Sequence, residues 1–326
     1  MNPSHQQPLL SVQNVTKHYP VTSTLPWSPP KAFVRAVDGL SFEVLPRKTF
    51  SIVGESGCGK TTTAKLVLRL ENPTSGRVLF QGRDIADLDR QHEAHYRRSV
   101  QAVFQNPFSS LKPRMRVIDL VAEPRVIRGT IGRDELRREV EHQLDAVGLD
   151  PAIINSFPHE LSGGMRQRVA IARALILEPL MIVLDEPVSA LDVSVRAQIM
   201  NLFKAIQDRS GISYLLIAHD LATTRYLSHQ VLVMYLGQMV ETAESNELFS
   251  TPLHPYTHAL IAASAPSRRW ENPEEHILES DLPSPIAPPS GCRFHTRCPR
   301  AFERCPSKVP ELREISPGHH VACHLY

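Results

Sequence analysis

The sequence lacks a long apolar stretch, has little net charge and has almost no cysteine before residue 292. Its most apolar run, 174–184, contains Glu178 and Pro179 and is shorter than the roughly 20 residues that span a bilayer. The formal net charge of +2, with Lys and Arg scattered along the chain, argues against the basic stripe of a nucleic-acid-binding protein. We therefore expect no membrane span and no DNA or RNA partner.

The N-terminal residues 1–7 lack the basic start and apolar core of a secretory signal, so we expect the chain to stay in the cytosol. Hydrophobic residues at 42% and charged residues at 21% are ordinary for a folded globular protein. The length of 326 residues suits one large domain with a smaller appendage.

The N-terminal part of the chain is predicted to be rich in strands. Segments 9–19 and 33–44 carry β-branched and aromatic residues, and a Pro-rich insertion, 20–30, separates them as a surface loop. The short apolar run 49–53 enters a glycine-rich turn, and 62–70 has helical composition. The order is therefore strand, loop, helix.

A helical subdomain is predicted over 89–178. Apolar residues recur there at helical spacing, with Gly148 as a stop: Leu136, Val140, Leu144 and Val147. Further on, 181–184 and 213–218 are continuous apolar runs typical of buried parallel strands, and 193–208 is predicted as the helix that connects them.

The end of the chain differs in composition. Segment 282–291 contains four prolines and predicts a semi-rigid extended linker. Beyond it, four cysteines follow the spacing C-x₅-C-x₆-C-x₁₇-C: Cys292, Cys298, Cys305 and Cys323. Four thiolates can complete a cubane iron–sulfur cluster or a tetrahedral zinc site, but reduced structural thiols are also common in the cytosol. The residues alone leave these three alternatives open.

Segment 54–61, Gly-Glu-Ser-Gly-Cys-Gly-Lys-Thr, fits the pattern G-x-x-x-x-G-K-[ST] between a strand and a helix. Backbone N–H groups of such a loop converge on phosphate oxygens, a lysine reaches the β- and γ-phosphates, and the hydroxyl binds Mg²⁺. The nucleotide contacts are therefore predicted at Gly54, Glu55, Ser56, Gly57, Cys58, Gly59, Lys60, Thr61 and Thr62. Thr61 is also a predicted Mg²⁺ ligand.

Cys58 lies inside this loop, beside Lys60. It is either a small filler or a reactive thiolate, because a helix N-terminus lowers the pKa of a thiol. We expect alkylation of this thiol to block ATP binding.

A second glycine-rich turn opens the helical segment 161–174. Ser162 is predicted to cap that helix, and the N-terminus at Gly163 and Gly164 is predicted to be a second anion site that faces the γ-phosphate of another molecule. This segment resembles the signature sequence of ABC ATPases. The other motifs of that family follow in its order: Gln105, Asp185, Glu186, Asp192 and His219.

The resemblance implies an α/β P-loop NTPase fold of ABC ATPase type, with an inserted helical subdomain and an antiparallel β subdomain. Asp185 ends an apolar strand, where its carboxylate can hold Mg²⁺ through water, and Glu186 is the predicted catalytic base. The family gives His219 a γ-phosphate contact, Gln105 the link between Mg²⁺ and the membrane subunit, and Tyr19 a stacking contact with adenine. Taken one at a time, each also has a simpler interpretation: His219 as a loop histidine, Gln105 as a surface amide and Tyr19 as a core aromatic residue.

In this family the signature helix serves the opposite subunit, so two ATP molecules are expected between two such domains. The chain alone is then nearly inactive. Met165 stands where relatives usually have glutamine, and a thioether cannot donate the amide's hydrogen bond, so the site completed by this signature is expected to be weaker. Whether the partner is a second copy or a homologous chain stays open.

The last part of the chain extends the resemblance over 9–326. The motifs at 254–260, 282–285 and 291–299 are similar to the C-terminal extension of ATP-binding subunits of bacterial dipeptide and oligopeptide importers. The implied domains are 1–250 for the ATPase and 251–326 for the Cys-bearing extension, where some relatives carry a [4Fe–4S] cluster.

The same resemblance implies a peripheral location on the cytoplasmic face of the bacterial inner membrane. The implied partners are a second homologous ATPase, two multi-span permeases and, indirectly, a periplasmic or extracellular solute-binding protein. Related importers carry nickel, opines or glutathione. A soluble ABC ATPase without a transport function is disfavoured, because the sequence has neither a long heptad insertion nor a second cassette. A small-molecule P-loop kinase would leave 161–165 unexplained.

Overall fold

The computed structural model describes residues 7–21, 32–105, 111–129, 131–264 and 282–326. The chain divides into two compact units. The first unit is Met1–Asp87 with Leu216–Tyr326, and the second is Leu88–Leu215. Most of the Pro-rich insertion, and residues 106 and 107 of the segment around Gln105, lie outside the described residues.

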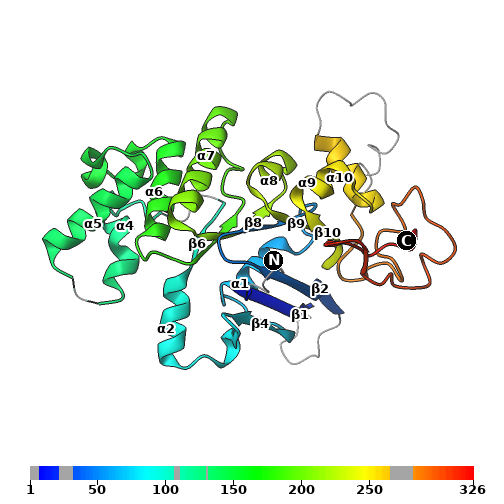
Figure 1. Cartoon of the computed structure of the whole chain (residues 1–326). Coiled ribbons are helices and arrows are strands. Elements are labelled where there is room, and N and C mark those ends of the chain that lie inside the picture. The colour runs from blue at the N-terminus through cyan, green and yellow to red at the C-terminus, as the bar shows by residue number, and fades with distance from the viewer. Residues whose placement is uncertain (1–6, 22–31, 106–110, 130, 265–281) are drawn as a thin grey trace, which may run out of the picture. The chain divides into compact units, whose positions relative to one another are not determined.

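The first unit holds two groups of strands (Figure 1). One group is a four-stranded antiparallel sheet in the order β2-β1-β4-β5: β1 (Leu10–Val21), β2 (Ala32–Val44), β4 (Ser75–Phe80) and β5 (Arg83–Asp84). The other group runs in the order β11-β12-β10-β9-β3: β3 (Thr49–Val53), β9 (Gln230–Tyr235), β10 (Gln238–Glu244), β11 (Arg313–Ser316) and β12 (His319–Val321). The pairing of β3 with β9 is parallel.

The predicted order of strand, glycine-rich turn and helix is confirmed around β3. Every residue of β3 is buried, as is every residue of β9 except its first, which is the pattern of a parallel strand covered on both faces. The helices of the first unit follow: α1 (Lys60–Val67), α8 (Leu221–Leu227), α9 (Ser245–Ser250) and α10 (Pro255–Ser264). The residues of 54–59 form the turn between β3 and α1.

The second unit is mainly helical. Its elements are α2 (Arg90–Ser99), β6 (Val100–Val103), α4 (Val117–Val126), α5 (Arg133–Ala146), α6 (Gly163–Leu175), β7 (Met181–Asp185) and α7 (Val193–Ser210), with short 3₁₀ turns at Pro151–Asn155 and Pro158–Glu160. Helices α4, α5 and α6 pack against one another (Figure 1). The helical spacing predicted for α5 is confirmed, because Val140 and Leu144 are buried and Gly148 follows the helix at φ +69°. Strand β8 (Ser213–Ala218) contains the boundary between the units.

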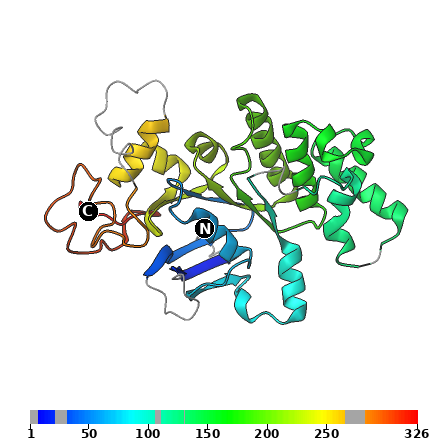
Figure 2. The same ribbon diagram turned by 180° about the vertical axis from the view of Figure 1, so that it is seen from behind.

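The C-terminal extension is hydrogen-bonded to the body of the first unit. Strand β12 pairs with β10, with Glu241 opposite Val321, and both ribbon views place the C-terminal segment beside β10 (Figures 1 and 2). The backbone N–H of Arg35 in β2 donates to the carbonyl of Pro285 at 3.1 Å. The segment predicted as a semi-rigid extended linker over 282–291 therefore also bonds to β2.

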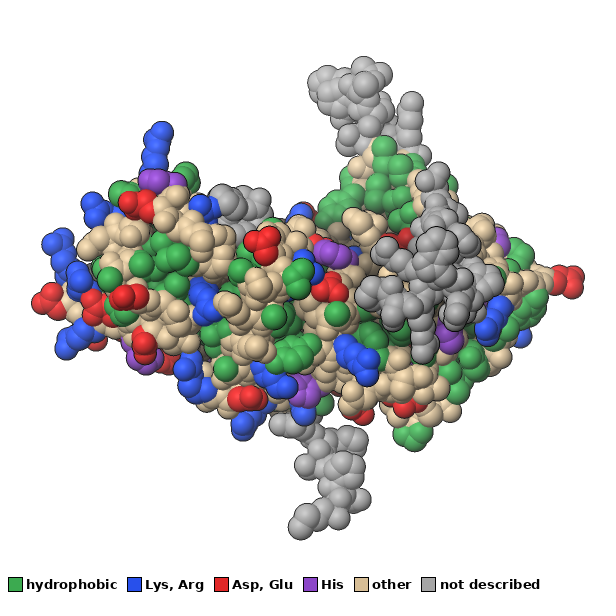
Figure 3. All heavy atoms as spheres, turned by 90° about the horizontal axis from the view of Figure 1, so that it is seen from above, with side chains coloured by type: hydrophobic (Ala, Val, Ile, Leu, Met, Phe, Trp, Pro, Cys, Tyr) green, Lys and Arg blue, Asp and Glu red, His purple; other side chains and the backbone are tan. Residues whose placement is uncertain are grey.

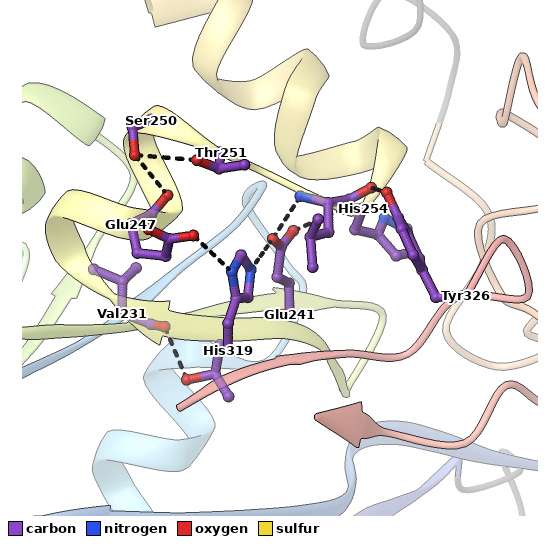
Figure 4. Close-up of polar contacts among 10 residues, drawn as sticks. Val231, Glu241, Glu247, Ser250, Thr251, His254, His319 and Tyr326 are labelled. Carbon is purple, nitrogen blue, oxygen red and sulfur yellow. Dashed lines mark hydrogen bonds and ion pairs between the residues drawn. The ribbon is translucent and has the colours of Figure 1, made fainter. Parts of the chain in front are cut away.

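Glu241 anchors this extension from a fully buried position in β10. Its carboxylate accepts hydrogen bonds from the backbone N–H groups of Leu253 at 2.7 Å and His254 at 2.9 Å (Figure 4). It also bonds to Nε2 of His319 in β12 at 2.7 Å. One carboxylate therefore joins β10, the start of α10 and the last strand of the chain.

The surface of the described residues agrees with the scattered charge of the sequence. On the face seen in Figure 3, Lys and Arg side chains are interspersed with Asp and Glu side chains. Within the described ranges, no helix combines the length and the apolar character that a membrane crossing requires.

Replacing Glu241 by alanine should destabilise the chain. The substitution leaves the part-buried N–H of Leu253, the buried N–H of His254 and the ring of His319 without their Glu241 acceptor. We expect this to lower the free energy of unfolding by about 3 kcal/mol. Glu244→Ala, at the exposed end of the same strand, is the matched control and should change it by less than about 0.5 kcal/mol. Urea unfolding measures both; equal midpoints for the two variants would refute the anchoring role of Glu241.

Candidate nucleotide site

The phosphate loop, residues 54–61, depends on glycines at three positive φ angles. A side chain at Gly54 would come within 2.2 Å of the carbonyl oxygen of Met234, and one at Gly59 within 2.1 Å of that of Ala36. Gly57, at φ +81°, faces open space on the exposed side of the loop. Two of these glycines are therefore required by close backbone contacts, and the third by its φ angle.

Lys60 lies at the first position of α1, with only 5% of its surface exposed. Its Nζ donates hydrogen bonds to the carbonyl oxygens of Gly54 at 2.7 Å and Glu55 at 2.8 Å. The ammonium group thus lies inside the curve of the loop, next to exposed Ser56 and Thr61. This arrangement collects a cation, a hydroxyl group and the N-terminus of a helix at one point, as phosphate binding requires.

Cys58 is a buried filler of this loop. Its side chain is 1% exposed, and burial raises the pKa of the thiol, although the nearby charge of Lys60 lowers it in part. Burial thus favours the filler over a reactive thiolate, because desolvation of the thiol outweighs the nearby charge of Lys60. The blocking of ATP binding by alkylation stays a prediction.

In the second unit, Gln105 and Glu186 lie together. Strands β6 and β7 are parallel, with Val103 opposite Leu184, so the residues that follow them meet at the same edge. The side-chain amide of Gln105 donates to Oε2 of Glu186 at 2.7 Å. Gln105 is exposed, as a surface amide would be, and it makes this contact across 81 residues.

Glu186 has a left-handed backbone conformation, at φ +49°. A residue other than glycine pays about 1–3 kcal/mol for such a conformation, and residues of this kind cluster at functional sites. Asp185, before it, is 8% exposed at the end of β7. The strand therefore presents two adjacent carboxylates, one buried and one half-buried, beside the Gln105 amide.

The signature segment begins α6 as predicted. The Ser162 hydroxyl accepts a hydrogen bond from the N–H of Met165 at 3.3 Å, so the capping role is confirmed. Ser162 is exposed. A side chain at Gly164 would meet Val195 of α7 at 2.7 Å, so this glycine has a packing role whether or not it binds an anion. Both roles are compatible with an exposed helix N-terminus.

Three other predicted residues are placed by the structure. Asp192 is exposed at the start of α7, and His219 is exposed directly after β8. Tyr19 in β1 is half-buried, with Lys17 Nζ 4.9 Å from its ring centroid, so it is not a core residue. The predicted site residues thus fall into two sets, one in each unit.

The four cysteines of the C-terminal extension are free thiols that influence one another electrostatically. Burial raises the pKa of Cys292 to about 11, and the neighbouring thiols Cys323, Cys305 and Cys298 add to the rise. The N–H of Cys292 also donates to the carbonyl of Cys305 at 2.8 Å. Within the described ranges, no group of three or more His, Cys, Asp or Glu residues is arranged to hold a metal ion.

The sequence reasoning missed two residues that contact the phosphate loop. Arg297 and Tyr256 both bond to Glu55. Each lies in a motif that resembles the family's C-terminal extension. Each is about 200 residues or more from Glu55 along the chain, so no local sequence pattern indicates the contact.

Comparison with known proteins assigns the chain to a family. Residues 37–189 match the family described as ABC transporter, and residues 240–305 match the oligopeptide/dipeptide transporter C-terminal region. The chain is 44% identical over its whole length to the oligopeptide transport ATP-binding protein AppF of Bacillus subtilis (strain 168), covering 100% of both chains. It is 47% identical to the probable peptide ABC transporter ATP-binding protein y4tS of Sinorhizobium fredii, covering 97% of this chain and 90% of that relative.

Solved structures agree with this assignment. The ATP-binding cassette MJ0796 bound to ADP and Pi matches with a TM-score of 0.63 and 28% identity, covering 72% of this chain and 98% of that one. The cbiO1 protein of Clostridium perfringens, part of the ABC transporter complex cbiONQ, matches with a TM-score of 0.64 and 25% identity, covering 84% of this chain and 100% of that one. The chain therefore belongs to the ABC transporter ATPases, in the group that carries the oligopeptide/dipeptide transporter C-terminal region.

Proposed function

We propose that this ATPase drives an importer of dipeptides or oligopeptides from the cytoplasmic face of the bacterial inner membrane. The observation that carries the proposal is the match over the entire chain, extension included, to relatives named for peptide or oligopeptide transport. Importers of nickel, opines or glutathione are the alternatives. Substrate choice in such systems belongs to the permeases and the solute-binding protein, so this chain does not touch the cargo.

The phosphate loop supplies the binding half of the mechanism. Exposed Ser56, Gly57 and Thr61 line its outer side, and buried Lys60 supplies the positive charge that the β- and γ-phosphates require. Mg²⁺ neutralises developing charge on the phosphates when it is bound, and we assign its ligands to Thr61, Gln105 and Asp185.

Glu186 acts as the general base in this proposal. Its carboxylate is half-buried and already oriented by the Gln105 amide at 2.7 Å, so it can accept a proton from a water molecule held beside it. His219 orients the same water. A change in the position of Gln105 would move the Glu186 carboxylate as well, which gives a membrane partner that contacts Gln105 control over hydrolysis.

Two protomers complete the active arrangement. Exposed Ser162, with Gly163 and Gly164, meets the γ-phosphate held by the facing protomer, and exposed Asp192 lies on the same assembled surface. Tyr19 stacks on adenine. We propose a homologous ATPase as the second protomer, and Met165 makes the site that this signature completes the weaker of the two.

Two variants separate binding from hydrolysis in the assembled transporter. Glu186→Gln should leave the affinity for MgATP within about threefold and lower turnover roughly 100-fold or more, because it removes only the base. Lys60→Ala should weaken MgATP binding by about 2 kcal/mol, because it removes a charged donor to the phosphates. Lys65→Ala, exposed on the same helix, is the control. Full hydrolysis by Glu186→Gln would remove that residue from the mechanism.

Purification of the tagged chain from native membranes tests the transport role. We expect two multi-span permeases and a second, related ATPase to copurify, because the chain must act on a membrane partner. Membranes that hold the untagged chain are the control for non-specific capture. A chain recovered without any membrane protein would favour a soluble ABC ATPase.

We propose a [4Fe–4S] cluster at Cys292, Cys298, Cys305 and Cys323. The residues that would hold it are four thiols from one segment, the donor type that iron–sulfur clusters use. Anaerobically purified protein should then contain equal amounts of iron and acid-labile sulfide and absorb visible light. Cys305→Ser should lose both signals, and Cys58→Ser should keep them. If the folded protein is colourless and free of metal, the cluster is refuted and the four cysteines are reduced thiols. If it contains zinc and no iron, the site is a tetrahedral zinc site.

A further inference from the structure

Glu55 of the phosphate loop is held by an arginine of the C-terminal extension. The Arg297 guanidinium donates to Oε2 of Glu55 at 2.7 Å and to Oε1 at 3.0 Å, which is a two-pronged ion pair. The side chain of Arg297 is only 3% exposed, and that of Glu55 is 22% exposed. A pair of this kind fixes orientation as well as distance, and its shielding from water strengthens it.

The backbone of Glu55 is also held by the extension. Its N–H donates to the hydroxyl of Tyr256 at 2.8 Å, and Tyr256 is fully buried in α10. The Tyr256 ring packs against Tyr235 at 4.8 Å and Phe294 at 5.3 Å between centroids. Arg297 in turn donates to the Tyr235 hydroxyl at 3.4 Å, so both contacts to Glu55 come from one buried cluster.

The carbonyl of Glu55 is engaged on the opposite side, by Cys58 N–H at 3.3 Å and Lys60 Nζ at 2.8 Å. Every polar group of Glu55 therefore has a partner. Gly54 precedes it and Gly57 follows two residues later, and glycine restricts the backbone less than any other residue. The course of this part of the loop is therefore set at Glu55.

We propose that Arg297 is a positioning residue for nucleotide binding: it holds Glu55, and through Glu55 the loop whose N–H groups receive the phosphates. This inference rests on the proposed function of the loop. Arg297 directly precedes Cys298, so a rearrangement of the four-cysteine segment moves the same guanidinium. The extension then orders the nucleotide site, and by linkage bound nucleotide orders the extension.

Binding of MgATP to the full-length chain, followed by calorimetry, tests the inference. Arg297→Met should raise Kd about tenfold, and Arg297→Lys, which keeps the charge but loses the fork, should raise it less. Glu55→Gln should also raise Kd. The double variant of Glu55→Gln and Arg297→Met should be no worse than Arg297→Met alone, because both changes break one pair.

Arg293→Met is the matched control. Arg293 lies in the same segment, is equally buried and bonds to Asp38 and to the carbonyl of Leu236, not to the loop. It should lower the midpoint of urea unfolding about as much as Arg297→Met and change Kd less than twofold. An equal rise in Kd for both arginine variants would overturn the proposal, since general loosening of the extension would then explain it.

Hydrogen–deuterium exchange gives a second measurement that a merely structural role would not change. In the wild-type chain, MgATP should slow exchange over 291–305, and in Arg297→Met this slowing should be lost. If the wild-type chain binds MgATP and Arg297→Met has the same Kd and the same exchange, the inference is refuted and the proposed function stands. A wild-type chain that does not bind MgATP would refute both.

Discussion

The backbone of residues 54–59 passes so close to its neighbours that two of its positions have no room for a side chain. Carbonyl oxygens of Met234 and Ala36 lie where the Cβ atoms of Gly54 and Gly59 would be. Met234 lies in β9, which pairs with β3, and Ala36 lies in β2. The phosphate loop is therefore held against the strands of the first unit, and the buried Lys60 inside its curve depends on the same contacts.

In the second unit, strand pairing brings the predicted catalytic residues together. Two parallel strands, β6 and β7, end at one edge and so bring Gln105 to Glu186. The backbone at Glu186 is strained, with φ at +49°. Gln105 and Glu186 thus follow strand ends, where an irregular backbone conformation costs the sheet no hydrogen bonds.

The C-terminal extension belongs to the first unit in a physical sense. Glu241 joins it to β10, β12 extends the same group of strands, and Arg297 and Tyr256 reach Glu55. An extension attached at so many buried points cannot change independently of the phosphate loop. In this chain the segment that carries Cys292, Cys298 and Cys305 therefore also carries the arginine that holds Glu55 of the phosphate loop.

The sequence alone determined the local features. The strand, loop and helix around 54–61, the buried strands β7 and β8, the stop at Gly148 and the cap at Ser162 follow from patterns within a few residues, because φ requirements, capping and hydrophobic periodicity act at short range. The contacts between these elements depend on the tertiary structure. It buried Cys58, bonded Pro285 of the predicted linker to β2, and joined Arg297 to Glu55 across 242 residues. Desolvation and ion pairing depend on which distant residues surround a group, and no spacing along the chain records that.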